Sequence, residues 1–279
     1  MLKSYCSTFG EESIMNTLDK PILKKIWRAL AEFSLLEPGD KVLIGYSGGK
    51  DSLFLALALS QIQKDLQFPI QLACVHIDLG FGLEIASHRE YLEKLGLPLF
   101  IVPTKIGELI AKPNRQNPCS RCAYFRRGAL KKFAQGRGYT KIALAHHNDD
   151  AVETLLMSLL YSGQIKTLAP NTIWDQSGLT IIRPLIYLRE HHVRKVTEAL
   201  IIEPLENPCP HAEASKRGEI KELIHRLSSE NPTVYSNLAS SLRAGRPMDL
   251  WPEALPEAEL KKRFAQFASS SGTDNNNDS

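Results

Sequence analysis

A strand, a glycine turn and a helix follow one another early in the chain, and this unit constrains the fold most. After Lys41, residues 42–46 are apolar and rich in branched side chains, which predicts a buried strand over 41–46. The apolar run at residues 53–59 predicts a helix. The turn between them reads Ser47, Gly48, Gly49, Lys50, Asp51 and Ser52. Because glycines allow close approach and a helix N-terminus attracts anions, we expect these six residues to bind phosphate.

The spacing of this turn excludes two commoner phosphate-binding loops. A Walker loop requires glycine at position 44 and Ser or Thr after the lysine, but this chain has Ile44 and Asp51 there. The dinucleotide fingerprint fails because no second glycine lies at the required offset from Gly45. The turn instead resembles the PP-loop of the ATP pyrophosphatases. That resemblance implies cleavage of ATP between its α- and β-phosphates.

Predicted strands alternate with predicted helices along most of the chain. The strands are expected at residues 41–46, 70–77, 99–102, 141–145 and 179–182. This alternation predicts an α/β fold: a doubly wound, mainly parallel five-stranded sheet with helices on both faces and helical additions at both ends. Ligands of such sheets bind at the carboxyl ends of the strands, so His76 should border the nucleotide site.

The expected organisation has four parts. Residues 1–39 form a leading helical segment, 40–206 the core, 207–266 a C-terminal helical region and 267–279 a disordered polar tail. In the C-terminal region, basic side chains of a predicted helix at 214–227 are available to RNA phosphates. They are Lys216, Arg217, Lys221 and Arg226.

Composition and charge narrow the function classes. No apolar stretch has the length of a membrane span and the first residues lack a signal-peptide core, so we expect a cytoplasmic protein. The chain has five cysteines, which are sparse and odd in number and therefore do not indicate a disulfide framework. Metal or redox chemistry is favoured instead. Residues 109–148 contain nine Lys or Arg and no acidic residue, a pattern suited to the phosphates of ATP or of a nucleic acid.

Cys119 and Cys122 stand at the start of a predicted helix, where the dipole and nearby arginines favour thiolates. A single C-x-x-C pair is compatible with a redox pair, half a zinc site or two cluster ligands. The tripeptide Asn-Pro-Cys recurs at residues 207–209. If the two tripeptides meet in space, Cys209 completes a three-thiolate site.

The predicted strand at 141–145 leads into His146-His-Asn-Asp-Asp150. Asp149 or Asp150 could bind Mg²⁺ beside the ATP and stabilise the leaving pyrophosphate. A structural alternative is that Asn148 or Asp149 caps the helix that follows. The two roles are compatible.

Five short motifs in order resemble those of the tRNA 2-thiocytidine synthetase family, PP-loop sulfurtransferases with an iron–sulfur cluster. They are the turn at Ser47, the Cys119/Cys122 pair followed by Arg126-Arg127, the His146 element, Arg183-Pro-Leu185 and the late Pro-Cys at 208–209. The match runs from about residue 22 to 227. It implies ATP-dependent adenylylation of a cytidine C2 oxygen in the tRNA anticodon loop, followed by replacement of that oxygen with sulfur.

The resemblance also implies cofactors, partners and residue roles. Cys119, Cys122 and Cys209 would hold a [4Fe–4S] cluster with one open iron, and Asp51 and Asp150 would place Mg²⁺. Ser47–Ser52, His76, Arg127 and His146 would contact ATP. The expected partners are tRNA and a sulfur donor such as a cysteine desulfurase, with no membrane, and a homodimer is one assembly to consider.

The chain departs from the family pattern at Ala212, where members commonly have a further cysteine. A Cys₃His zinc site using His211 is therefore one alternative. Lysidine synthetase, the thiouridine-forming enzymes, a non-catalytic ATP- and cluster-binding RNA module, and a small-molecule substrate are the others.

Overall fold

The computed structural model describes residues 18–111, 118–174, 178–205, 216–243 and 254–270. Internal contacts divide the chain into two compact units, residues 1–242 and 243–279. Helix α10 (Glu257–Ser270) belongs to the second unit. All other elements belong to the first.

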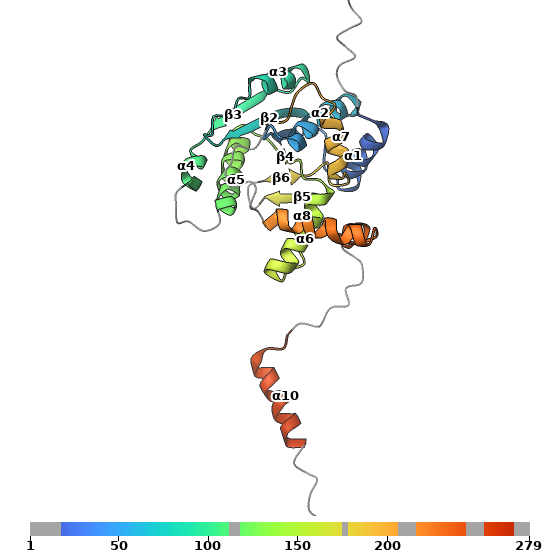
Figure 1. Ribbon diagram of the computed structural model, residues 1–279. Helices are drawn as coiled ribbons and strands as arrows, with labels where there is room; N and C mark the ends of the chain where they lie inside the picture. Colours follow the sequence, from blue (N-terminus) through green and yellow to red (C-terminus); the bar gives the residue numbers. More distant parts are fainter. Residues whose placement is uncertain (1–17, 112–117, 175–177, 206–215, 244–253, 271–279) are drawn as a thin grey trace, which may run out of the picture. The chain divides into compact units, whose positions relative to one another are not determined.

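A six-stranded sheet lies at the centre of the first unit (Figure 1). Its order is β3-β2-β1-β4-β6-β5, and every neighbouring pair is parallel except β5 with β6. The strands are β1 (Lys41–Gly45), β2 (Gln71–Asp78), β3 (Leu99–Pro103), β4 (Lys141–Ala143), β5 (Asn171–Trp174) and β6 (Leu179–Ile182). The parallel register of β1, β2 and β4 brings their carboxyl ends to one edge, where the phosphate-binding turn follows β1.

Helices cover both faces of the sheet because alternate strand residues point to opposite sides (Figure 1). Val42 and Ile44 pack with the helices of one layer, whereas Leu43 packs with α5. The first layer contains α1 (Lys20–Glu32), α2 (Lys50–Asp65), α3 (Ala86–Lys94) and α7 (Glu190–Thr197). Residues 53–59 of α2 have no exposed surface. A helix buried on all sides has no polar face, which agrees with the unbroken apolar run in this part of the sequence.

Three helices pack against one another around a separate small cluster of buried residues. They are α6 (Asn148–Ser162), α8 (Lys216–Glu230) and α9 (Val234–Ser241). Val152 of α6 and Ile220 and Ile224 of α8 form their buried centre. The remaining helices are α4 (Ile106–Ala111) and α5 (Pro118–Gly136). None of the described helices is both long and apolar enough to cross a lipid bilayer.

The sequence predicts the fold class correctly, with two differences of detail. The sheet has six strands rather than five, because β5 pairs antiparallel with β6 at the edge. Helix α10 extends through residues 267–270, which were expected to be disordered. The division expected after residue 206 stays a prediction, and α8 and α9, which follow it, pack against α6 of the core.

Candidate active site

The turn after β1 forms a compact loop that ends at the N-terminus of α2. Gly48 has a φ of 84°, a left-handed conformation that favours glycine. The Ser52 hydroxyl donates to the Gly49 carbonyl at 2.9 Å and accepts from the Ser47 N–H at 3.2 Å, so the loop is held by its own side chains. Since a helix N-terminus attracts anions, residues 47–52 have the backbone geometry of a phosphate site.

A segment from distant sequence lies against this loop. The Leu205 N–H donates to the Gly48 carbonyl at 3.0 Å. The His88 ring joins the same two regions, with Nε2 3.1 Å from the Glu203 carbonyl and Nδ1 2.5 Å from the Tyr46 hydroxyl. Burial lowers the pKa of His88, so the neutral ring can donate to the first and accept from the second. Residues 203–205 are thus fixed to the phosphate loop.

A cavity of about 210 Å³ borders the loop at Ser47 and Gly49. It is lined by Tyr46, Ser47, Gly49, His76, Ile77, Asp78, Leu79, Phe81, Leu83, Arg126 and Leu205. The His76 Nδ1 atom lies 3.1 Å from the Tyr46 carbonyl, and burial lowers the pKa of this histidine. The mixture of apolar, aromatic and few polar groups suits a nucleoside. Arg126 lines this cavity, and its neighbour Arg127 does not.

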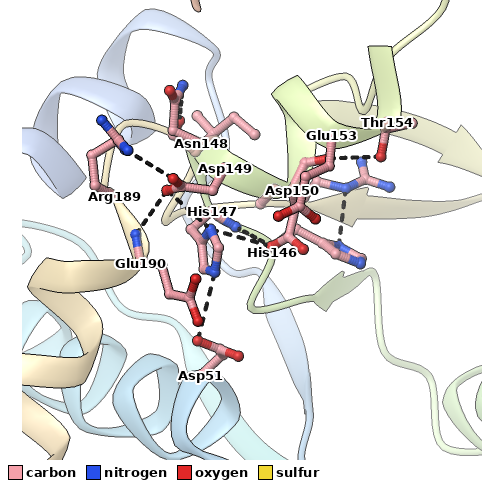
Figure 2. A network of polar contacts seen from close by, with 12 residues as sticks. Asp51, His146, His147, Asn148, Asp149, Asp150, Glu153, Thr154, Arg189 and Glu190 are labelled. Atoms are coloured by element: carbon pink, nitrogen blue, oxygen red, sulfur yellow. Dashed lines mark hydrogen bonds and ion pairs between the residues drawn. The ribbon is translucent and has the colours of Figure 1, made fainter. Parts of the chain in front are cut away.

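A second cavity, of about 270 Å³, borders the loop at Lys50 and Asp51. It is lined by Lys50, Asp51, His147, Asp150, Glu153, Glu190, Arg217, Gly218 and Lys221. Its residues come from α2, α6, α7 and α8, and Figure 2 shows how the carboxylates and His147 converge. The structure thus brings Asp51 and Asp150 to one cavity.

His147 lies between these two carboxylates (Figure 2). Its Nε2 atom is 3.7 Å from Asp51 Oδ1 and its Nδ1 atom is 3.4 Å from Asp150 Oδ2. The Asp150 carboxylate also accepts from the His147 N–H at 2.9 Å, which caps the start of α6. Asp150, rather than Asn148 or Asp149, therefore makes this capping bond. Among the described residues no group of three or more potential ligands is arranged to hold a metal ion.

Asp149 has a different task from Asp150. It accepts from the Glu190 N–H at 2.8 Å and from Arg189 Nε at 2.9 Å, which fixes the first turn of α7. Glu190 in turn lies 3.3 Å from the Lys50 ammonium and 2.5 Å from that of Lys221. Burial would raise the pKa of Glu190, but the two lysines lower it to about 2. Sequence reasoning missed Glu190, because nothing local to it indicates that it reaches the loop.

Glu153 is a second carboxyl that sequence reasoning missed. Its side chain is 7% exposed, and its nearest cation is Arg217, at 3.6 Å. Burial raises the pKa of Glu153 to about 7, and the Asp150 charge acts in the same direction. Its place one turn after Asp149 on α6 is the only sequence signal that could have found it.

His146 and Arg127 do not line either of the two cavities described above. Arg183 Nε donates to His146 Nδ1 at 3.3 Å. Burial lowers the pKa of His146 to about 4, and the charge of Arg183 acts in the same direction. Arg127 is close enough to Arg183 for its charge to help burial lower the pKa of that guanidinium to about 10. Their expected contacts with ATP stay predictions.

The cysteine pair lies in the first turns of α5. Cys119 is exposed and Cys122 partly exposed, and three residues of helix place their side chains on one face. Two accessible sulfurs with this spacing, in a segment without acidic residues, suit two ligands of an iron–sulfur cluster. Cys209 and His211 lie outside the described residues. Cys74 is buried, and burial raises the pKa of its thiol, so it is a core residue.

Comparison with known proteins gives consistent matches. The PP-loop domain family matches residues 19–227. The tRNA-cytidine(32) 2-sulfurtransferase of Pelobacter propionicus is 33% identical over 235 residues, which cover 82% of this chain and 87% of that protein. The tRNA-cytidine(32) 2-sulfurtransferase 1 of Francisella philomiragia subsp. philomiragia is 37% identical over 238 residues, which cover 83% and 92%. Among solved structures, the U34-tRNA thiolase NcsA from Methanococcus maripaludis with its [4Fe–4S] cluster has a TM-score of 0.67 at 25% identity, covering 80% of this chain and 76% of that one.

Proposed function

Because this chain belongs to the family of PP-loop tRNA-cytidine 2-sulfurtransferases, we propose that it uses ATP to replace the C2 oxygen of a tRNA cytidine with sulfur. The names of its relatives favour cytidine 32 as the substrate position. The cytoplasmic location expected from the sequence is compatible with a tRNA substrate.

One observation carries the proposal: helix α5 joins the cysteine pair to the first cavity. Cys119, Cys122 and Arg126 follow at intervals of three and four residues, so they share one face of α5. Arg126 lines the cavity beside Ser47 and Gly49. With a rise of about 1.5 Å per residue, the two cysteines lie roughly 6–10 Å along the helix from Arg126. A nucleotide in this cavity and a sulfur site on α5 would be close enough to act on one base.

The first proposed step activates the cytidine. Its C2 oxygen attacks the α-phosphorus of ATP, the bond to the β-phosphate oxygen breaks, and pyrophosphate leaves. The loop at residues 47–52 holds the phosphates, since its left-handed Gly48 and the N-terminus of α2 form an anion site. Lys50 is held for this role by Asp51 at 2.9 Å and Glu190 at 3.3 Å.

The second proposed step replaces the activated oxygen. A sulfur nucleophile adds to C2, and the C2–oxygen bond breaks as AMP leaves. Cys119, Cys122 and Cys209 would hold a [4Fe–4S] cluster, whose open iron supplies a place to carry the sulfur atom. The sulfur donor we expect is a cysteine desulfurase, and a thiol reductant supplies the two electrons that convert its persulfide sulfur to the sulfide level of the nucleophile. The acid-free segment 109–148 would orient the tRNA anticodon arm.

Mg²⁺ is part of the proposal through Asp51 and Asp150. Both carboxylates line the second cavity, on either side of His147. Carboxylates and phosphate oxygens together are the usual ligands of Mg²⁺, so the ion would bind with the nucleotide.

Reconstitution with defined components tests the function. The anaerobically reconstituted protein is incubated with tRNA, ATP, Mg²⁺ and a cysteine desulfurase system, and the tRNA nucleosides are analysed by mass spectrometry. We expect 2-thiocytidine together with AMP and pyrophosphate. The appearance of 2-thiouridine or lysidine would assign a different PP-loop activity. Stoichiometric zinc without iron, or tRNA binding without release of pyrophosphate, would contradict the proposal.

A further inference from the structure

The basic side chains of helix α8 face a different part of the molecule from the one that the sequence predicts. Its apolar residues Ile220 and Ile224 are 2% and 9% exposed and pack against Val152 of α6. This packing points Arg217 and Lys221, one turn apart on α8, into the second cavity beside the phosphate loop. They were expected to face RNA.

Within this cavity a single carboxylate holds two lysines from different parts of the chain. Glu190 Oε1 lies 3.3 Å from Lys50 Nζ, and Glu190 Oε2 lies 2.5 Å from Lys221 Nζ. Lys50 belongs to the phosphate loop and Lys221 to α8. Glu190 is 16% exposed and is itself fixed through its N–H to Asp149. The two ammonium groups are thereby held close together before any ligand binds.

Arg217 adds a third cation to the same cavity. Its guanidinium lies 2.9 Å from Asp150 and 3.6 Å from Glu153. Lys221 and Arg217 still have donors to offer, because the Lys221 ammonium carries three N–H groups and the Arg217 guanidinium five. The Lys50 ammonium already faces both Asp51 oxygens, each at 2.9 Å, and Glu190, so it would exchange one of these contacts for a phosphate oxygen. A polyphosphate can therefore bind Lys221 and Arg217 without breaking the ion pairs that position them.

The two cavities differ in the ligand chemistry that they suit. The first, at Ser47 and Gly49, is largely apolar and aromatic, whereas the second, at Lys50, brings together three cations and four carboxylates, among them the proposed Mg²⁺ ligands Asp51 and Asp150. A nucleoside triphosphate has the same division, with an aromatic base at one end and highly charged phosphates at the other. The loop between the cavities is where its α-phosphate would lie.

We propose that Lys221 and Arg217 of α8 bind the β- and γ-phosphates of ATP together with Lys50, and that α8 belongs to the nucleotide site rather than to the RNA surface. The inference rests on the proposed binding of ATP at the phosphate loop. It adds α8 to that site, and it assigns Glu190 as the residue that positions Lys50 and Lys221.

Calorimetric titration of the full-length protein tests this assignment with Mg²⁺-pyrophosphate, Mg²⁺-ATP and AMP as ligands. We compare Lys221→Ala with Lys216→Ala, a control on the same helix whose ammonium pairs with Glu219, 3.2 Å away. The two side chains are 54% and 63% exposed, so neither change should unfold the protein. Lys221→Ala should weaken pyrophosphate and ATP about tenfold, the effect of one charge-assisted hydrogen bond, and leave AMP unchanged. Lys216→Ala should leave all three affinities unchanged.

Lys50→Ala separates failure of this inference from failure of the proposed function. If Lys50→Ala weakens ATP but Lys221→Ala does not, α8 is outside the nucleotide site and the inference is wrong. If Lys221→Ala weakens tRNA binding and spares pyrophosphate, α8 is an RNA-binding helix and the inference is also wrong. If the unsubstituted protein binds no ATP, the proposed function fails first.

Discussion

Leu205 occupies the space that a side chain on Gly48 would need. A Cβ atom at position 48 would lie 2.5 Å from Leu205 Cδ1, and the two residues are also joined by a 3.0 Å backbone hydrogen bond. A contact of 2.5 Å is too short for two carbon atoms, which prefer at least about 3.5 Å. Glycine at position 48 is thus required by a neighbour 157 residues away as well as by its own backbone.

Gly48→Ala should therefore impair nucleotide binding more than backbone strain alone explains. Gly39→Ala is the matched control, because Gly39 has nearly the same φ, 83°, with open space around it. Left-handed strain costs about 1–2 kcal/mol in either variant. We expect Gly39→Ala to bind ATP normally and Gly48→Ala to lose at least about tenfold in affinity, measured by calorimetry. Equal ATP affinity in the two variants would contradict a role for Leu205.

Glu190→Gln should destabilise the fold in a pH-dependent way. The pKa of Glu190 is lowered from 4.5 to about 2, so its ion pairs stabilise the protein above pH 4.5 and are lost as the pH falls towards 2. Urea denaturation at neutral pH should show that the free energy of unfolding of the variant is lower by roughly 1–2 kcal/mol, a value that allows for screening of Lys221 by solvent. The difference should shrink steadily at acidic pH. A difference that is independent of pH would rule out the two-lysine arrangement.

Glu153→Gln should have the opposite effect on stability, raising the free energy of unfolding at high pH. Burial raises the pKa of Glu153 from 4.5 to about 7, so the folded protein loses stability as the pH rises from 4.5 through 7 and this carboxyl ionises. The free energy of unfolding of the variant should match that of the unsubstituted protein near pH 4.5 and exceed it by roughly 3 kcal/mol above about pH 8. Urea titrations across this range provide the measurement. Glu219→Gln, an exposed change on α8, should show no such trend.

Replacement of Cys119 and of Cys74 should have different effects, the first on the cluster and the second on stability. Cys119→Ser should abolish the visible absorbance of the reconstituted cluster and the thiolation of tRNA, while ATP binding is retained. Cys74→Ala should keep the absorbance and lose roughly 1 kcal/mol of stability, because Cys74 is a buried core residue. Loss of absorbance in both variants would indicate a damaged fold rather than a missing ligand.

Local patterns predict most of the fold and only part of the site. The buried strands and the phosphate-binding turn are visible because apolar runs and glycines act over a few residues. Strand β5 was missed because Asn171, Thr172 and Ile173 are exposed at the sheet edge, so no apolar alternation marks it.

The missed site residues depend on packing between distant helices. Glu190 reaches Lys50 only because Asp149 fixes the start of α7, and Lys221 joins them only because Ile220 is buried against α6. Arg126 lines the first cavity instead of Arg127 because adjacent helix residues point about 100° apart. Such relations are set by the direction of whole elements, which a single sequence does not display.

The anchoring of residues 203–205 makes the phosphate loop depend on parts of the chain that are distant in sequence. The Leu205 N–H donates to the Gly48 carbonyl, and the His88 ring contacts both the Glu203 carbonyl and the Tyr46 hydroxyl. A substitution of His88 would therefore release residues 203–205 and disturb the loop without changing any residue within it. Loss of nucleotide affinity can thus originate far along the chain from residues 47–52.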